Sequence, residues 1–259
     1  MKINIEEAKE EFIKYTENFN TKDKNVKRKQ QHSIRVMKIA EQIATNLKLS
    51  EEQIQLATLI GLLHDIGRFK QYTDIGLGNN LEGFDHGDYG TKLLFKEGLI
   101  RKFIETNKYD EIIKKSIKNH NKFSIEAGLT QEELLFAKLI RDADKIDILY
   151  ESIDIYYKNN EEEVNKSVLS EKIYNEFTKK ATIKKGKNVR LKFIDDITCV
   201  IAFIYDINYK TSFEIIKEKN YINKIIDRYN FKDQATKIKV DEIKKIANEY
   251  IKEKIMEEK

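Results

Sequence analysis

The sequence predicts an all-α protein. Its 259 residues include no proline and only ten glycines, so the chain lacks the residues that turn-dense β proteins use at their corners. Lysine, glutamate, isoleucine and leucine are abundant, which favours helices. No convincing run alternates apolar and polar residues with the period of two that a half-buried strand requires. Hydrophobic residues make up 40% of the chain, which is enough for a sizeable core.

The first three helices are expected in residues 4–18, 26–48 and 50–63. In each of them, apolar residues recur at intervals of three and four, which places them on one face of a helix. The third helix begins with a capping box, in which Ser50 accepts a hydrogen bond from the backbone of Gln53 and the Gln53 side chain reaches back.

The glycines mark the irregular part of the chain, because eight of the ten fall between Gly61 and Gly98. A second capping box, formed by Thr130 and Glu133, opens a helix that is expected to reach about Tyr150. The remaining helices are expected in residues 88–96, 109–120, 161–180, 190–207, 211–229 and 235–256.

Composition also limits the partners and the compartment. A net charge of +4 from 48 basic and 44 acidic residues is too balanced to indicate a nucleic-acid partner. No stretch approaches the ~18 apolar residues of a membrane span, and the N-terminus has no apolar signal region. The single cysteine, Cys199, lies in an apolar run and fits a core position in a reducing compartment. We therefore expect a cytoplasmic protein.

Histidine and aspartate residues lie on the apolar faces of the predicted helices. His32, His64, His120 and Asp144 each lie three or four residues from an apolar residue of the same face. Buried imidazoles and carboxylates are the donors that a borderline divalent ion requires. The alternative is that these histidines are ordinary hydrogen-bonded core residues. The spacing does not decide between the two interpretations, because intervals of 32, 22, 34 and 24 residues separate His32, His64, His86, His120 and Asp144.

The local sequences around these residues resemble a known family. A first histidine, His32, is followed by the doublet His64-Asp65 in HDIGRF and by Asp144 in RDADKID. This order resembles the HD-domain superfamily of metal-dependent phosphohydrolases. His86 in DHGDYG and His120 in NHN look like the two extra histidines of the subfamilies that bind two metals. The resemblance covers about residues 28–150.

The resemblance implies a site with one or two divalent ions, of which Mn, Fe, Co, Ni, Zn and Mg are candidates. It implies that the first ion is bound by His32, His64, Asp65 and Asp144. Asp65 would bridge to a second ion, completed by His86 and His120, so that His64 and Asp65 form the catalytic centre.

Three basic residues near these motifs are candidates for binding the phosphates of a substrate. Arg68 follows Asp65 by three residues, and Arg141 and Lys145 flank Asp144. A guanidinium matches the geometry of a phosphate, although each of the three also has acidic neighbours with which it would form a salt bridge.

The reaction expected from the resemblance is hydrolysis of a phosphoester or phosphoanhydride in a nucleotide or a related small phosphate compound. A metal-activated water would attack the phosphorus, in agreement with the absence of a G-x-S-x-G motif or a candidate Cys–His pair. The motifs are similar to those of bacterial HD enzymes that split dinucleoside tetraphosphates. Those enzymes are shorter, so their substrate is not carried over.

The expected organisation has an N-terminal helix in residues 1–27, an HD core in residues 28–150 and a helical extension in residues 151–259. The extension is expected to pack on the core and to shape either the substrate pocket or a homodimer interface. Two other functions stay open at this stage. One is a regulatory protein that binds metal and nucleotide without turnover, and the other is a metal-free helical protein.

Overall fold

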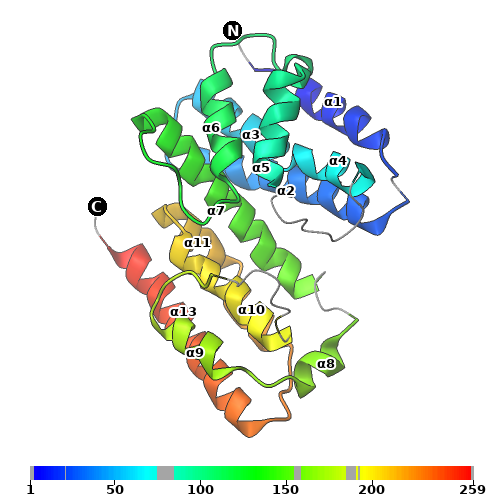
Figure 1. Ribbon diagram of the computed structural model, residues 1–259. Helices are drawn as coiled ribbons and strands as arrows, with labels where there is room; N and C mark the ends of the chain where they lie inside the picture. The colour runs from blue at the N-terminus through cyan, green and yellow to red at the C-terminus, as the bar shows by residue number, and fades with distance from the viewer. Residues whose placement is uncertain are drawn as a thin grey trace. The chain divides into compact units, whose positions relative to one another are not determined.

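The computed structural model describes residues 3–20, 22–74, 85–154, 159–184, 191 and 193–257. Every regular element in these residues is helical, and no strand occurs among them, which confirms the predicted fold class. The chain divides into two compact units, Met1–Asp144 and Lys145–Lys259. The boundary falls within the long helix α7, which spans Gln131–Asp154 (Figure 1).

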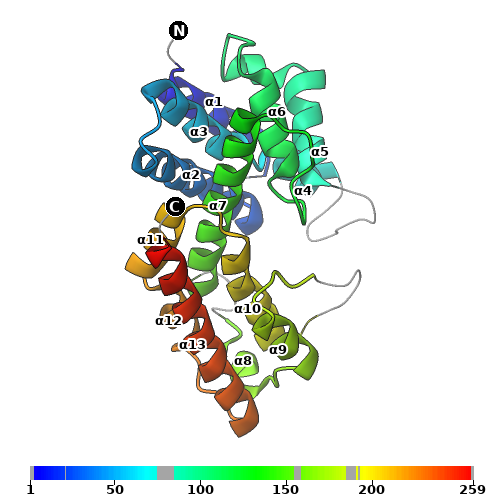
Figure 2. The ribbon, with the colours of Figure 1, turned by 90° about the vertical axis from the view of Figure 1, so that its left-hand side faces the viewer.

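Three helices open the first unit: α1 (Ile5–Glu17), α2 (Lys24–Asn46) and α3 (Glu51–Leu63). They lie side by side (Figures 1 and 2). The predicted capping box of α3 is present, because the Ser50 hydroxyl accepts from the backbone N–H of Gln53. Helices α2 and α3 approach each other closely at Gly61, where a Cβ atom would lie 2.9 Å from the Cα atom of Met37.

Shorter elements complete the first unit. They are α4 (Ile66–Asp74), α5 (His86–Thr91), a π-helical turn (Lys92–Lys96), a 3-10 turn (Leu99–Lys102) and α6 (Asp110–Asn119). Helix α5 packs between α4 and α6. The helix expected in residues 88–96 is therefore an α-helix that continues as a π-helix, and α4 was not predicted at all.

The second unit contains α8 (Glu161–Lys166), α9 (Glu171–Thr178), α10 (Phe193–Ile201), a 3-10 turn (Ala202–Asp206), α11 (Lys210–Glu218), α12 (Tyr221–Ile226) and α13 (Gln234–Met256). Two helices that were predicted to be continuous are each divided into two. The helix expected in residues 161–180 is α8 and α9, because Ser170 caps a new helix. The helix expected in residues 211–229 is α11 and α12, because Asn220 adopts a left-handed conformation with φ of 55°.

Each unit has a buried apolar core. In the first, Phe12 of α1 packs edge-on against Phe69 of α4, with ring centroids 5.7 Å apart. In the second, Cys199 is buried as expected. No helix in the described part of the chain is long and apolar enough to cross a membrane.

Candidate metal centre

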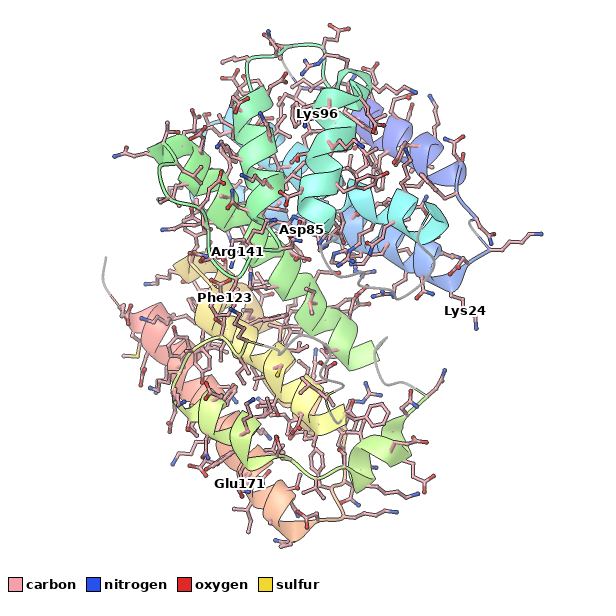
Figure 3. The ribbon with its side chains drawn as sticks, viewed as in Figure 1. Lys24, Asp85, Lys96, Phe123, Arg141 and Glu171 are labelled. Atoms are coloured by element: carbon pink, nitrogen blue, oxygen red, sulfur yellow. The ribbon has the colours of Figure 1, made fainter. Side chains whose placement is uncertain are left out.

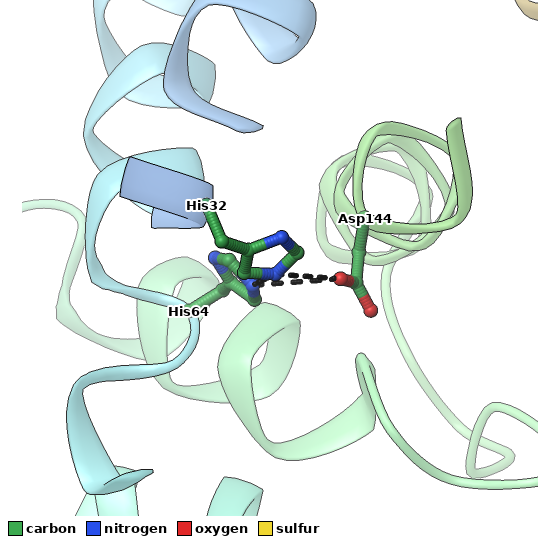
Figure 4. A group of neighbouring side chains, drawn as sticks. All are labelled: His32, His64 and Asp144. Atoms are coloured by element: carbon green, nitrogen blue, oxygen red, sulfur yellow. Dashed lines mark hydrogen bonds and ion pairs between the residues drawn. The ribbon is translucent and has the colours of Figure 1, made fainter. Parts of the chain in front are cut away.

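Three helices bring the first group of donors together. His32 lies on α2, His64 follows the last residue of α3, and Asp144 lies on α7. The Nε2 atoms of His32 and His64 are 3.2 Å apart, and the Oδ1 atom of Asp144 lies 3.1 Å and 3.6 Å from them, respectively. Figure 4 shows both rings directed at this carboxylate. Three ligand atoms therefore converge on one point.

A second group lies on the other side of Asp65. His86 is the first residue of α5, and His120 follows the last residue of α6. Their Nε2 atoms are 3.1 Å apart. They lie 3.4 Å and 3.6 Å from the Oδ1 atom of Asp65.

The carboxylate of Asp65 separates the two groups. Its Oδ2 atom lies 3.6 Å from Nε2 of His32 and 3.7 Å from Nε2 of His64. Its Oδ1 atom faces His86 and His120 and has no hydrogen-bond partner among the described residues, although it is buried. A buried carboxylate oxygen without a donor is costly unless something else satisfies it. The two oxygens thus face two different sets of nitrogen atoms.

Helix ends orient two of the imidazole rings. The last carbonyl groups of a helix have no partner within it. His64 directs Nδ1 to the carbonyl oxygen of Gly61 at 2.8 Å, and His120 directs Nδ1 to that of Ile117 at 2.6 Å. The carbonyl can only accept, so each Nδ1 atom carries the proton. Each ring therefore presents Nε2, the atom that ligation requires, to the centre.

Burial and charge set the protonation states. Burial lowers the pKa of His64 and holds that of His86 well below its usual value, so both rings are neutral at pH 7. Burial alone would raise the pKa of Asp65, but Lys29 and the surrounding imidazoles outweigh it and hold the pKa well below its usual range. Burial opposes the ionisation of Asp144 too, but the adjoining rings of His32 and His64 outweigh it and leave the pKa of this carboxyl well below its usual value.

These residues fit a divalent cation. His32, His64 and Asp144 form one group of converging ligand atoms in the described part of the chain, and His64, Asp65 and His120 form another. Neutral imidazole nitrogen and anionic carboxylate oxygen together are the donors of Zn, Mn, Fe and related ions. A buried cluster of carboxylates and imidazoles is otherwise unfavourable.

Lys29 also belongs to the site, although it is not among the site residues predicted from the sequence. Its ammonium group lies 2.7 Å from Oδ2 of Asp65, and the two side chains are only 11% and 3% exposed. Lys29 lies three residues before His32 on the buried face of α2, between Val26 and Val36. A lysine on an apolar face was the available signal, since lysine is almost never buried without a partner.

The three basic candidates lie in different surroundings. The Nε atom of Arg68 lies 3.7 Å from Oδ1 of Asp65, and its side chain is 23% exposed. The guanidinium of Arg141 instead donates to the carbonyl oxygens of Asn119 at 2.8 Å and Lys122 at 2.6 Å. Figure 3 shows Arg141 on α7. The ammonium group of Lys145 pairs with Asp206 at 2.9 Å. Of these three residues, only Arg68 therefore places its charge beside Asp65.

Comparison with known proteins agrees with this geometry. Residues 30–149 match the family model of the HD domain. This part of the chain is an HD domain, and it belongs to a superfamily whose members are typically metal-dependent phosphohydrolases. No curated protein and no solved structure matches the chain.

Proposed function

We propose that the protein is a metal-dependent phosphohydrolase that uses two divalent ions. The observation that carries the proposal is the position of Asp65, whose two oxygens face two separate sets of imidazole nitrogens. A carboxylate in this position is suited to bridge two cations. Its buried Oδ1 atom receives no hydrogen bond among the described residues, which supports a second cation on that side.

The ligands of the first ion would be His32, His64, Asp65 and Asp144. Those of the second would be Asp65, His86 and His120. A pair of divalent ions supplies a water of lowered pKa and neutralises charge on the phosphoryl oxygens.

Residues around this centre orient its imidazole rings and place positive charge beside Asp65. Gly61 and Ile117 hold the rings of His64 and His120 through their carbonyl oxygens. The ammonium group of Lys29 and the guanidinium of Arg68 place two positive charges beside Asp65. Because Arg68 is partly exposed, it is the residue we assign to a non-reacting phosphate.

The substrate we propose is a nucleotide or a related small phosphate compound, cleaved at a phosphoester or phosphoanhydride bond. The family supports a phosphorylated small molecule. Access to the centre supports a small one, because the donors are almost fully enclosed and the side chains of His86 and Asp144 are each only 14% exposed.

The test combines metal content with activity. Protein purified without chelator is loaded with Mn²⁺ and incubated with a panel of nucleotides and phosphoesters, and released phosphate is measured. We expect hydrolysis in the wild type and its loss in Asp65→Asn, which keeps the side-chain volume. Asp241→Asn, at an exposed position on α13, is the matched control and should retain wild-type activity.

The same panel separates the proposal from a regulatory role. Metal uptake and tight nucleotide binding without product would show a binding protein. If the wild type takes up no metal under any loading condition, the proposal is refuted and the histidines are ordinary core residues.

A further inference from the structure

The side chain of Arg141 is buried in the first unit although it carries a permanent positive charge. It is only 2% exposed, and burying a charge is costly unless its donors are used. Its Nη1 atom donates to the carbonyl oxygens of Asn119 at 2.8 Å and Lys122 at 2.6 Å. Longer contacts of 3.4 Å join Nη1 to the carbonyl oxygen of His120 and Nη2 to that of Phe123. Figure 3 labels Arg141 and Phe123.

Two of these four carbonyl groups belong to the end of α6. Asn119 is the last residue of this helix and His120 is its C-cap. The last carbonyl groups of a helix have no partner within it, and they form the negative end of its dipole, which favours a cation. Arg141 therefore caps α6 at the residue that carries a candidate ligand. We define the second cation position as Asp65, His86 and His120.

The segment after α6 is closed into a loop around the guanidinium. The Oδ1 atom of Asn119 accepts from the backbone N–H of Glu126 at 2.8 Å, and its Nδ2 atom donates to the carbonyl oxygen of Lys115 at 2.8 Å. The carbonyl groups of Lys122 and Phe123 lie within this loop. An arginine suits them because its planar fork donates in several fixed directions, whereas the ammonium group of a lysine is a point charge.

The orientation of the His120 ring depends on the backbone that Arg141 holds. Nδ1 of this ring donates to the carbonyl oxygen of Ile117 at 2.6 Å, a contact that requires residues 117–120 to keep their helical conformation. A neutral imidazole has one proton, on one nitrogen or on the other. If the end of α6 unwinds, Nδ1 loses its acceptor and the proton can move to Nε2, the atom that ligation requires.

Helix α7 thus contributes to both cation positions, because Asp144 lies three residues after Arg141 on this helix. We propose that Arg141 is a positioning residue that holds the end of α6 so that His120 presents Nε2 to the second cation position. The guanidinium then acts on the backbone instead of on a phosphate. The effect on metal affinity rests on the two-ion function proposed above, whereas the effect on the His120 ring does not.

The experiment is nuclear magnetic resonance of the full-length protein labelled with ¹⁵N in histidine. The chain has four histidines, so each ring reports its own tautomer and its own ligation. His120→Asn and His64→Asn assign the two rings that matter most. In the metal-free wild type at pH 8, we expect both of these rings to carry the proton on Nδ1.

Two substitutions of Arg141 test the inference. Arg141→Met removes every donor, and we expect His120 to lose the Nδ1 tautomer. His64 should keep that tautomer, because it donates to Gly61 at the end of a different helix. Arg141→Lys keeps the charge but not the fork and should give a smaller loss in the same direction. The test therefore survives if Arg141→Met fails to fold.

The matched control is Arg101→Lys. Arg101 also donates to a backbone carbonyl oxygen, that of Glu105 at 3.0 Å, but it lies at an exposed position in the 3-10 turn Leu99–Lys102. This variant should leave all four rings as they are in the wild type.

A titration with chelator-buffered Zn²⁺, followed in the same spectra, measures the affinity of each position, because ligation shifts the resonance of the nitrogen that binds. Outer partners of ligating histidines contribute roughly 10–100-fold to metal affinity. In Arg141→Lys, we expect His86 and His120 to respond at roughly 10-fold higher free Zn²⁺ than in the wild type. The change at His32 and His64 should be smaller.

Three results would overturn the inference. They are an unchanged His120 tautomer in both Arg141 variants, an unchanged affinity at the second cation position, and an equal change at His64, which would indicate general loosening of the unit. If the wild type binds Zn²⁺ at one position only, the two-ion function fails. The tautomer of His120 in the metal-free variants then still decides whether Arg141 orients this ring.

Discussion

The substitution Lys29→Met isolates the charge that Lys29 places beside Asp65. Methionine keeps most of the apolar stem, so packing on α2 is largely preserved. Because both side chains are nearly inaccessible to solvent, the variant leaves a carboxylate buried without its closest counter-charge. Removing one partner of a buried pair typically costs about 3–5 kcal/mol. In a unit of this size, that corresponds to a fall in melting temperature on the order of 10 °C.

A divalent ion should reverse most of this loss, because a cation bound to Asp65 replaces the missing charge. The assay is thermal unfolding followed by circular dichroism at pH 7, with chelator and with saturating Mn²⁺. We expect a large difference between wild type and variant in chelator and a difference less than half as large in Mn²⁺. Lys27→Met, at an exposed position of the same helix, should change neither melting temperature. An unchanged melting temperature in chelator, or the same loss with and without Mn²⁺, would refute the reasoning.

Two other predictions concern packing and pH. Gly67→Ala would place a Cβ atom 2.6 Å from the carbonyl oxygen of His86 and 2.8 Å from the backbone nitrogen of Gly90. Since backbone must move, we expect a loss of about 1–3 kcal/mol in urea unfolding and weaker binding of a second Mn²⁺; a variant as stable as wild type would contradict the close approach of α4 and α5. The lowered pKa values of His64 and His86 mean that the unfolded chain binds more protons than the folded one below the ordinary imidazole pKa of about 6.5. The metal-free protein should therefore lose stability as the pH falls below about 6.5, and His64→Asn should flatten that dependence; a melting temperature constant from pH 7 to pH 5 would count against neutral buried rings.

Local sequence patterns predicted much of the fold. They failed where contacts distant in sequence determine whether a helix forms or ends. The capping boxes at Ser50 and Thr130 are present with the expected hydrogen bonds, because a cap depends on four consecutive residues. The break at Asn220 was not predicted, since an asparagine within an apolar pattern gives little indication of a left-handed conformation. Helix α4 was missed because it lies within the glycine-rich part of the chain.

The site was predictable in its residue types and not in its geometry. The order of His32, His64-Asp65 and Asp144 indicates the HD domain, which the family match confirms. Lys29 lies on an apolar face of its helix, but periodicity alone does not reveal that it pairs with a residue 36 positions away. The contact between His86 and Asn121 likewise depends on how α5 meets α6, which no local pattern encodes.

The close approach of α2 and α3 at Gly61 has a consequence for the order of folding. His32 and His64 belong to two consecutive helices joined by a short connection, and contacts between near neighbours in sequence form fastest. Asp144 arrives from a helix that is synthesised 80 residues after His64. We therefore expect the helical hairpin that carries the two imidazoles to form first, and the carboxylate of Asp144 to join it later.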